Sequence, residues 1–329
     1  MVRNSEKLAI NAIFTNQNIK FMYLLTFDWN PITGIDIVGN FKIHFYSLMW
    51  VAAFVIGWQI MKRIFIKENI KIEYLDPLFI YTVLATMLGA RLGHVIFYQS
   101  ELFTQDFFSV FLPFHFVPEF EFSGFSGLAS HGAAIGIIIG MYLYRRKYKY
   151  KSLMWILDRI VIPVASGAIF IRFGNFINSE IIGKITDSPF GVRFVQEFYN
   201  KREIVQLTGI KDYKQAYAAV TDNPQFISLL EAVPFRHPAQ LYEAVCYVFV
   251  FLILLFFYLK TKKSEQTGFL FGLFLVLLWT VRFFVEFVKE AQNAERADWL
   301  LNTGQWLSIP FIIIGLYFMF VYKPKTEVQ

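Results

Sequence analysis

The chain has 329 residues, of which 56% are hydrophobic, 19% aromatic and only 17% charged. Because soluble domains carry about 25% charged residues, this composition indicates a membrane protein. The formal net charge of +6 does not indicate a nucleic-acid-binding protein, because the lysines and arginines fall in short clusters beside apolar runs and form no binding stripe. The single cysteine, Cys246, excludes disulfides within the chain and cysteine-based metal sites.

Residues 1–42 are predicted to form an extracytoplasmic and interfacial segment. Residues 1–19 are polar and broken by Asn and Lys, so they lack the apolar core of a cleavable signal peptide, and none is expected. Residues 21–40 mix aromatic side chains with Pro31 and Gly34, which favours an interfacial lead-in over a spanning helix.

The remaining chain, residues 43–329, is predicted to be one all-α membrane domain. A spanning helix needs about 20 largely apolar residues. Seven stretches have this character: 43–62, 77–98, 129–145, 153–176, 239–259, 268–288 and 305–322. The third is the shortest, and its small residues favour close approach of a neighbouring helix. We therefore expect a seven-transmembrane-helix bundle.

Loop charges predict the orientation of this bundle. Basic residues follow the first, third, fifth and seventh stretches, whereas the loop at 99–128 contains no lysine or arginine. Since basic loops stay in the cytoplasm, we expect an extracytoplasmic N-terminus and a cytoplasmic C-terminus. The segment 179–235 is then a small extracytoplasmic head insertion, with a strand-like patch at 192–199 and helix-like stretches at 211–220 and 224–231.

In this orientation, polar residues from six helices fall at the level of the outer leaflet. They include His131 at the start of the third helix, Arg172 and Asn175 at the end of the fourth, and Arg282 and Glu286 at the end of the sixth. Charged groups beside hydrocarbon are costly, so they are functional candidates. Arginines with amides and a histidine suit a phosphate monoanion, because a guanidinium donates two hydrogen bonds to it.

Each polar residue also has a structural explanation. Arg172 alone could extend to the membrane surface, and Arg282 with Glu286, four residues apart, could form an ion pair. Arg91 lies between two glycines and is expected to bond a neighbouring backbone. The Asp-Arg pair at 158–159 is expected to be a pair of flanking charges at a helix start.

No metal or cofactor site is expected. The five histidines lack the spacing of zinc ligands, and the chain has no P-loop, no Gly-x-Ser-x-Gly and no dinucleotide-binding motif.

The polar residues belong to longer motifs distributed over nearly the whole chain. In order they are His44-Phe-Tyr46-Ser-Leu-Met, Gly89-Ala-Arg91-Leu-Gly93, Ser130-His131-Gly132, Arg172-Phe-Gly-Asn175-Phe-Ile-Asn178-Ser-Glu180, Arg236-His-Pro-Ala-Gln240-Leu-Tyr242-Glu243 and Arg282-Phe-Phe-Val-Glu286-Phe. By these motifs the sequence resembles the phosphatidylglycerol–prolipoprotein diacylglyceryl transferase family.

The resemblance implies a multi-pass enzyme of the bacterial inner membrane that performs the first step of lipoprotein modification. Such an enzyme transfers diacylglyceryl from phosphatidylglycerol to the thiol of a lipobox cysteine, forming a thioether and releasing glycerol 1-phosphate. Its partners are phosphatidylglycerol, prolipoprotein signal peptides with a lipobox cysteine, and membrane lipid, with no cofactor and no nucleic acid.

The resemblance also implies the site residues. Catalytic roles fall on His131, Arg172 and Arg282, with His131 as the candidate base. Substrate binding is expected from Arg172 and from six further residues, Tyr46, Gly132, Asn175, Glu180, Gly183 and Glu286.

Three positions depart from the family pattern. Ala133 stands where the family has a second glycine, and Trp279 replaces a tyrosine. Lys289 replaces an arginine, which keeps the positive charge but loses the planar fork of donors.

A secondary transporter or channel for an organic anion is the alternative, because intramembrane arginines suit it too. Such a protein is expected to show paired inverted repeats and polar groups near the membrane midplane. In this chain the charges favour one leaflet and no repeat is visible, so the transferase is the preferred interpretation.

Overall fold

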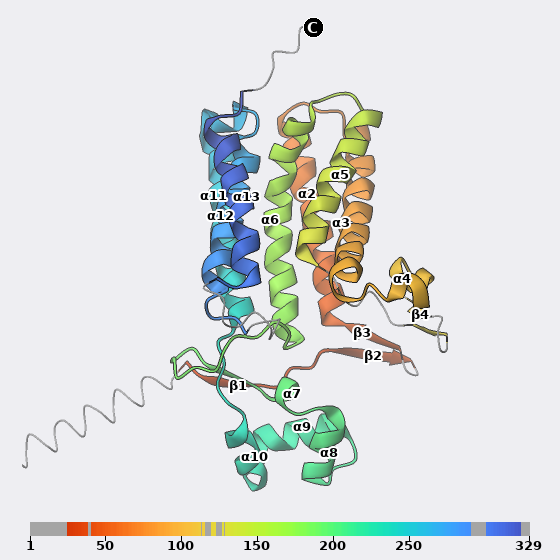
Figure 1. The fold of residues 1–329 in the computed structure, drawn as a ribbon, viewed down its shortest axis with the longest axis vertical. Helices are drawn as coiled ribbons and strands as arrows, with labels where there is room; N and C mark the ends of the chain where they lie inside the picture. The colour runs from red at the N-terminus through yellow and green to blue at the C-terminus, as the bar shows by residue number, and fades with distance from the viewer. Residues whose placement is uncertain are drawn as a thin grey trace, which may run out of the picture. The chain divides into compact units, whose positions relative to one another are not determined.

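The computed structural model describes residues 25–38, 41–112, 114–115, 120–122, 127, 129–290 and 301–323. Most of the segment predicted at 1–42, and part of the loop at 99–128, lie outside these residues. The described chain is mostly helical, and its strands are short (Figure 1).

Every one of the seven apolar stretches forms a helix. Their bounds are α2 Phe45–Lys67, α3 Leu75–Tyr98, α5 Ser130–Lys147, α6 Leu153–Ile177, α11 Ala239–Lys260, α12 Phe269–Val285 and α13 Thr303–Phe320. Among the described residues, five helices are long and apolar enough to cross a membrane, namely α2, α3, α6, α11 and α13. Helix α12 is apolar but shorter, and α5 carries three basic residues in its last turn. Seven crossings therefore remain a prediction, whereas a helical membrane protein is confirmed.

The chain divides into two compact units. The first contains residues 1–52, 168–249 and 277–312, and the second contains residues 53–167, 250–276 and 313–329.

In the second unit, α3 and α5 pack closely through glycines. A Cβ atom built on Gly132 of α5 would lie 2.8 Å from the Cα atom of Gly93 in α3. Gly136 lies in the same way against Gly89, where its Cβ would be 2.8 Å from the Cα atom. The close approach predicted from the small residues of the third stretch is thus confirmed.

The second unit also contains Arg91, which bonds backbone as expected. Its Nη2 atom donates to the carbonyl oxygen of Ser109 at 2.8 Å. Ser109 lies in η2 (Phe107–Val110), which follows the short helix α4 (Leu102–Gln105). Two further short strands of this unit, β4 (Phe114–His115) and β5 (Glu121–Phe122), pair antiparallel.

The charges at 158–159 are not solvated flanking charges, so that expectation was wrong. Asp158 is fully buried, and its carboxylate accepts from the backbone N–H groups of Gly268 at 2.6 Å and Phe271 at 2.9 Å. It therefore caps the first turn of α12, from a different helix. Arg159 pairs with Glu68 at 2.9 Å, which neutralises a second buried charge.

In the first unit, one pair of parallel strands connects the N-terminal segment to a later part of the chain, and a hairpin precedes α2. β1 (Phe27–Trp29) pairs in parallel with β6 (Val192–Phe194), and β2 (Gly34–Val38) pairs antiparallel with β3 (Phe41–His44) (Figure 1). The Trp29 ring stacks on Phe176 with centroids 4.3 Å apart, and its Nε1 donates to the Phe176 carbonyl at 2.9 Å. This contact holds β1 against the end of α6.

The segment predicted at 179–235 has a small hydrophobic core of its own. After β6 come α7 (Val195–Phe198), α8 (Lys201–Thr208), α9 (Tyr213–Asp222), η3 (Pro224–Phe226) and α10 (Ile227–Ala232). Its buried residues are Val195, Tyr199, Ile204, Ala216, Tyr217, Val220, Leu230 and Val233. The helices predicted at 211–220 and 224–231 are confirmed, whereas the strand predicted at 192–199 ends at 194.

Candidate active site

The turn after α6 has a strained backbone. Ser179 and Ile181 have φ values of 57° and 58°, a region that costs a β-branched residue about 1–3 kcal/mol. Between them lies Glu180, whose carboxylate accepts from Asn178 Nδ2 at 3.0 Å and from Asn175 Nδ2 at 3.3 Å. The turn therefore holds an exposed carboxylate next to the buried end of α6.

Arg172, about two turns before this bend, is buried with a buried counter-ion. Its Nε atom lies 2.6 Å from Oε2 of Glu243, and its Nη1 atom donates to Asn175 Oδ1 at 3.2 Å. Glu243, in the second turn of α11, is 0% exposed. Arg172 therefore does not extend to the membrane surface, because its guanidinium is fixed inside the protein.

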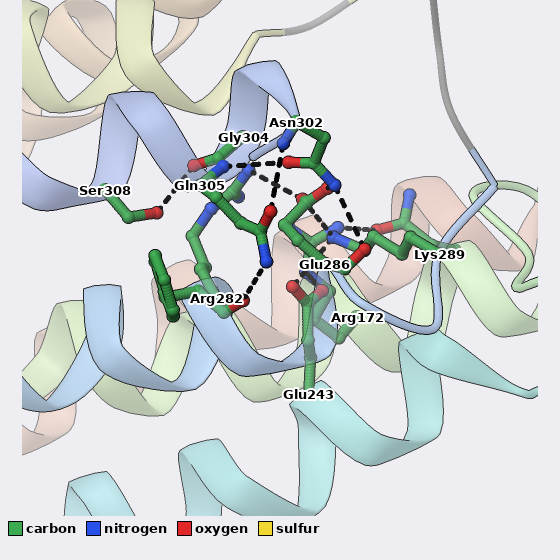
Figure 2. Close-up of polar contacts among 11 residues, drawn as sticks. Arg172, Glu243, Arg282, Glu286, Lys289, Asn302, Gly304, Gln305 and Ser308 are labelled. Atoms are coloured by element: carbon green, nitrogen blue, oxygen red, sulfur yellow. Dashed lines mark hydrogen bonds and ion pairs between the residues drawn. The ribbon is translucent and has the colours of Figure 1, made fainter. Parts of the chain in front are cut away.

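Glu243 is shared with a second cation. Its Oε1 atom lies 2.9 Å from Lys289 Nζ, which in turn lies 3.1 Å from Oε1 of Glu286. Glu286 also pairs with Arg282 at 3.8 Å. Figure 2 shows the resulting alternation of positive and negative groups, contributed by α6, α11, α12 and the turn that follows α12.

These five residues form what we call the buried charge network: Arg172, Glu243, Lys289, Glu286 and Arg282. These five residues include three cations and two carboxylates, so together they carry one net positive charge. A buried site with excess positive charge attracts an anion and strengthens its hydrogen bonds, because the dielectric there is low.

Residues at the start of α13 hold Glu286 in place. Asn302 Nδ2 donates to the Glu286 carbonyl at 3.0 Å and to its Oε2 atom at 3.3 Å. Gly304 lies so close that a Cβ there would be 2.8 Å from both carboxylate oxygens. A side chain at position 304 would therefore displace the carboxylate that orients Arg282.

Trp279, one of the departures from the family pattern, supports Arg282. The Arg282 guanidinium carbon lies 5.3 Å from the centroid of the Trp279 ring, a cation–π contact. The Trp279 ring is itself held by stacking on Phe311, with ring centroids 4.2 Å apart and ring planes at an angle of 8°.

Tyr46 and Gly183 also belong to this unit. The Tyr46 ring packs on Gly174, and its phenol lies within electrostatic range of Arg172 and Glu180. Gly183 has no room for a side chain, because its Cβ would lie 2.6 Å from the carbonyl oxygens of both His237 and Val288.

The backbone around Gly183 fixes the position of Lys289. Gly183 forms an isolated antiparallel bridge with Lys289, and Gly183 N donates to the His237 carbonyl at 2.9 Å on the other side. The His237 imidazole lies 3.2 Å from the Tyr242 hydroxyl, and burial lowers the pKa of His237, which favours the neutral ring. The packing around Gly183 leaves no space for a side chain, and its role in substrate binding stays a prediction.

His131 and Gly132 lie in the second unit. His131 is the second residue of α5 and is half-buried, and Gly132 makes the close contact with α3 described above. Six of the predicted site residues therefore lie near one another in the first unit, with Gly183 beside Lys289, while the approach of His131 to the two arginines stays a prediction.

Glu243 and Lys289 were not predicted as site residues. Glu243 was visible as a carboxylate inside an apolar helix, and such a group needs a cationic partner. Lys289 was identified only as a departure from the family pattern, where it replaces an arginine. Within the described ranges, no group of three or more His, Cys, Asp or Glu is arranged to hold a metal ion.

Comparison with known proteins gives one consistent result. The family model described as prolipoprotein diacylglyceryl transferase matches residues 33–321. Three relatives carry the name phosphatidylglycerol–prolipoprotein diacylglyceryl transferase. The protein of Bacteroides fragilis is 37% identical over 308 residues, which cover 93% of this chain and 99% of the relative. The protein of Tolumonas auensis is 36% identical, covering 88% and 95%, and that of Chloroherpeton thalassium is 32% identical, covering 92% and 96%.

The family's motifs are therefore carried on a chain of matching length, and every residue of the buried charge network except Lys289 lies in one of these motifs. The chain belongs to the prolipoprotein diacylglyceryl transferase family.

Proposed function

We propose that this protein transfers the diacylglyceryl group of phosphatidylglycerol to the thiol of a lipobox cysteine in a prolipoprotein. The sulfur–carbon bond of a thioether forms at C3 of the diacylated glycerol, and the bond from that carbon to the phosphate oxygen breaks. The thiol proton passes to a base, and glycerol 1-phosphate leaves with the bonding electron pair. The observation that carries this proposal is the excess positive charge of the buried charge network in a member of this family.

The cationic groups suit the leaving phosphate. Negative charge develops on the phosphate ester as the carbon–oxygen bond breaks, and preorganised cations stabilise it most effectively in a low-dielectric site. Arg172 and Arg282 carry this role in the proposal. Glu243 and Glu286 orient the two guanidinium groups without neutralising the whole network.

The nucleophile comes from the substrate, so the enzyme needs only a base for it. A free thiol has a pKa of about 8.5, and a histidine of about 6.5 is a suitable acceptor near neutral pH. His131 has this role in the proposal. Gly132, next to it, packs against Gly89 and Gly93 of α3 and so fixes where α5 begins.

The headgroup is proposed to bind at the bend after α6. Asn175 and Glu180 offer an amide and a carboxylate to the hydroxyl groups of the glycerol, and Tyr46 borders them. Gly183 lets the backbone at His237 and Val288 lie close to this bend.

The proposed arrangement in the membrane is a seven-helix inner-membrane protein. The N-terminus is extracytoplasmic, the C-terminus is cytoplasmic and the segment 179–235 is an extracytoplasmic head. The loop charges support this arrangement.

One assay tests the function. Purified protein is mixed with phosphatidylglycerol and a lipobox peptide, and mass spectrometry detects the peptide with an added diacylglyceryl group. The matched control peptide has serine in place of the lipobox cysteine. Absence of the thioether adduct with a folded protein would contradict the transferase, and ion-coupled anion uptake into vesicles would instead support a transporter.

A further inference from the structure

A polar pocket lies in the first unit, and none of its lining residues belongs to the buried charge network. Its volume is about 500 Å³. The β2–β3 hairpin and the segment from α7 to α9 line it with Thr33, Lys42, His44, Gln196, Asn200, Lys201, Tyr213 and Tyr217.

The pocket has three basic side chains and no acidic one in its lining. Lys42 Nζ donates to Thr33 Oγ1 at 2.7 Å, and Lys201 Nζ lies 4.9 Å above the ring of Tyr213. The nearby carboxylate of Asp36 is bound by Lys214 outside the lining. In the part of the chain that the structure describes, Lys42, His44 and Lys201 form no ion pair.

The basic groups destabilise one another. Burial lowers the pKa of His44, and the charges of Lys42 and Lys201 lower it further. Burial also lowers the pKa of Lys42, with Lys214 and Lys201 acting in the same direction and Asp36 opposing them. An anion between these groups would relieve both the repulsion and the loss of solvation.

Helix geometry adds to the positive potential. Lys201 is the first residue of α8, so the positive end of the α8 dipole lies at the pocket, whereas the start of α9 at Tyr213 is capped by the carboxylate of Asp212. The side chain of Asn200 already accepts from the backbone N–H of Glu203, so α8 contributes only its potential, and the donors come from Lys42, Lys201 and Tyr213.

We propose that this pocket binds a phosphate group, supplied either by free glycerol phosphate or by the headgroup of an anionic phospholipid. A phosphate offers three or more acceptor oxygens, which can meet Lys42, Lys201 and the Tyr213 hydroxyl together, whereas a carboxylate offers two. A lipid headgroup could supply the phosphate, because His44 directly precedes α2, and the end of a helix able to cross a membrane lies near the lipid headgroups. This site goes beyond the proposed transfer reaction, since none of its lining residues has a role in it.

The imidazole of His44 gives a readout specific to this pocket. The full-length protein is labelled with ¹³C-histidine in maltoside micelles, and the His44 signal is identified by its loss in His44→Gln. The pKa of His44 is then measured by NMR without ligand and with inorganic phosphate, glycerol phosphate or phosphatidylglycerol. Binding is expected to raise the pKa of His44 by about 0.5 or more, because a nearby negative charge favours the imidazolium.

Lys201→Gln is the informative variant. Its ammonium makes no hydrogen bond among the described contacts, so the substitution is not expected to disturb folding. It should reduce the apparent affinity for phosphate at least fivefold. Lys211→Gln removes the same charge from an exposed position of the same segment, and it should leave the affinity within twofold of the parent protein.

The three probes distinguish the two sources. An effect of the soluble phosphates assigns the pocket to free glycerol phosphate, and an effect of phosphatidylglycerol alone assigns it to a lipid headgroup. The proposal is overturned if no probe changes the pKa of His44 in a saturable manner, or if Lys201→Gln and Lys211→Gln behave alike.

Discussion

Glu243 is the residue on which the buried charge network depends most. It is the shared counter-ion of Arg172 and Lys289. Removing one partner of a buried ion pair costs about 3–5 kcal/mol, because the remaining charge stays buried without compensation. We expect Glu243→Gln to lower transfer from phosphatidylglycerol about 100-fold or more and to reduce the thermal midpoint of the purified protein.

The control for this variant is Glu290→Gln. Glu290 also pairs with an arginine, Arg236 at 2.9 Å, but its side chain is 55% exposed. Exposed ion pairs contribute about 0–1 kcal/mol, so the control should behave like the parent protein. Normal transfer by a folded Glu243→Gln protein would show that the orientation of Arg172 does not depend on this carboxylate.

Lys289 contributes a single charged atom to this network, so two substitutions can test the effect of its charge and the effect of its shape separately. Its Nζ atom contacts Glu243 and Glu286. Lys289→Arg keeps the charge and offers two donors to the two carboxylates, so we expect transfer within about threefold of the parent protein. Lys289→Met leaves two buried carboxylates with one cation fewer, and we expect a loss of about 100-fold.

The measurement is the initial rate of thioether formation at several concentrations of phosphatidylglycerol. A network that positions the arginines should affect kcat, because the transition state carries the additional charge. Equal losses in Lys289→Arg and Lys289→Met would mean that the lysine is required for its size and that its charge is unimportant.

Arg282→Lys tests the planar fork directly. The guanidinium lies over Trp279 and beside Glu286, and a lysine ammonium can reproduce the charge but not two parallel hydrogen bonds. We expect transfer from labelled phosphatidylglycerol to fall at least tenfold while membrane insertion is normal. Near-normal transfer would rule out a bidentate contact with the phosphate.

Most residues of the candidate site could be recognised in the sequence, but their partners could not. Arg172, Asn175, Glu180 and Arg282 were recognisable because polar groups in apolar helices are costly. Their pairing was not predictable, because Glu243 is distant in sequence from Arg172. The local pair of Arg282 and Glu286 was expected from their spacing, yet Glu286 lies nearer to Lys289, at 3.1 Å against 3.8 Å.

At the scale of elements, α12 begins where another helix supplies its cap. Asp158 of α6 accepts from the N–H groups of Gly268 and Phe271. A missing cap costs about 0.5–2 kcal/mol, and burial of the unpaired donors adds to it. We expect Asp158→Ala to lower the thermal midpoint clearly, whereas Glu73→Ala, at a side chain 63% exposed, should have little effect.

Element boundaries followed from hydrophobicity where helices were long and apolar. The central part of every apolar stretch is helical, because an apolar run of this length is typical of a helix and too long for a strand. The short elements of the segment 195–232 were harder. Asn200 and Glu203 form a capping box for α8, a pattern readable in the sequence, but α7 has four residues and too little periodicity to be recognised.

For the whole molecule, composition alone indicated a membrane protein, and the helices confirm it. Which ends of the helices lie in the cytoplasm could be inferred only from the loop charges, because the hydrophobic pattern of a spanning helix is the same in either orientation. Helix α5 is the critical element. If α5 did not cross the membrane, the residues after it would lie outside the cytoplasm.

Cysteine labelling tests this arrangement, because the chain has a single cysteine that can be removed. Cys246→Ser should retain full transfer, since the nucleophilic thiol belongs to the substrate peptide. In that background, Lys149→Cys, Lys211→Cys and Lys262→Cys place single thiols at exposed positions of three connecting segments. A membrane-impermeant maleimide should label only Lys211→Cys in intact spheroplasts, and all three after permeabilisation. Labelling of Lys149→Cys in intact spheroplasts would mean that α5 does not span, and the bundle would then have fewer than seven crossings.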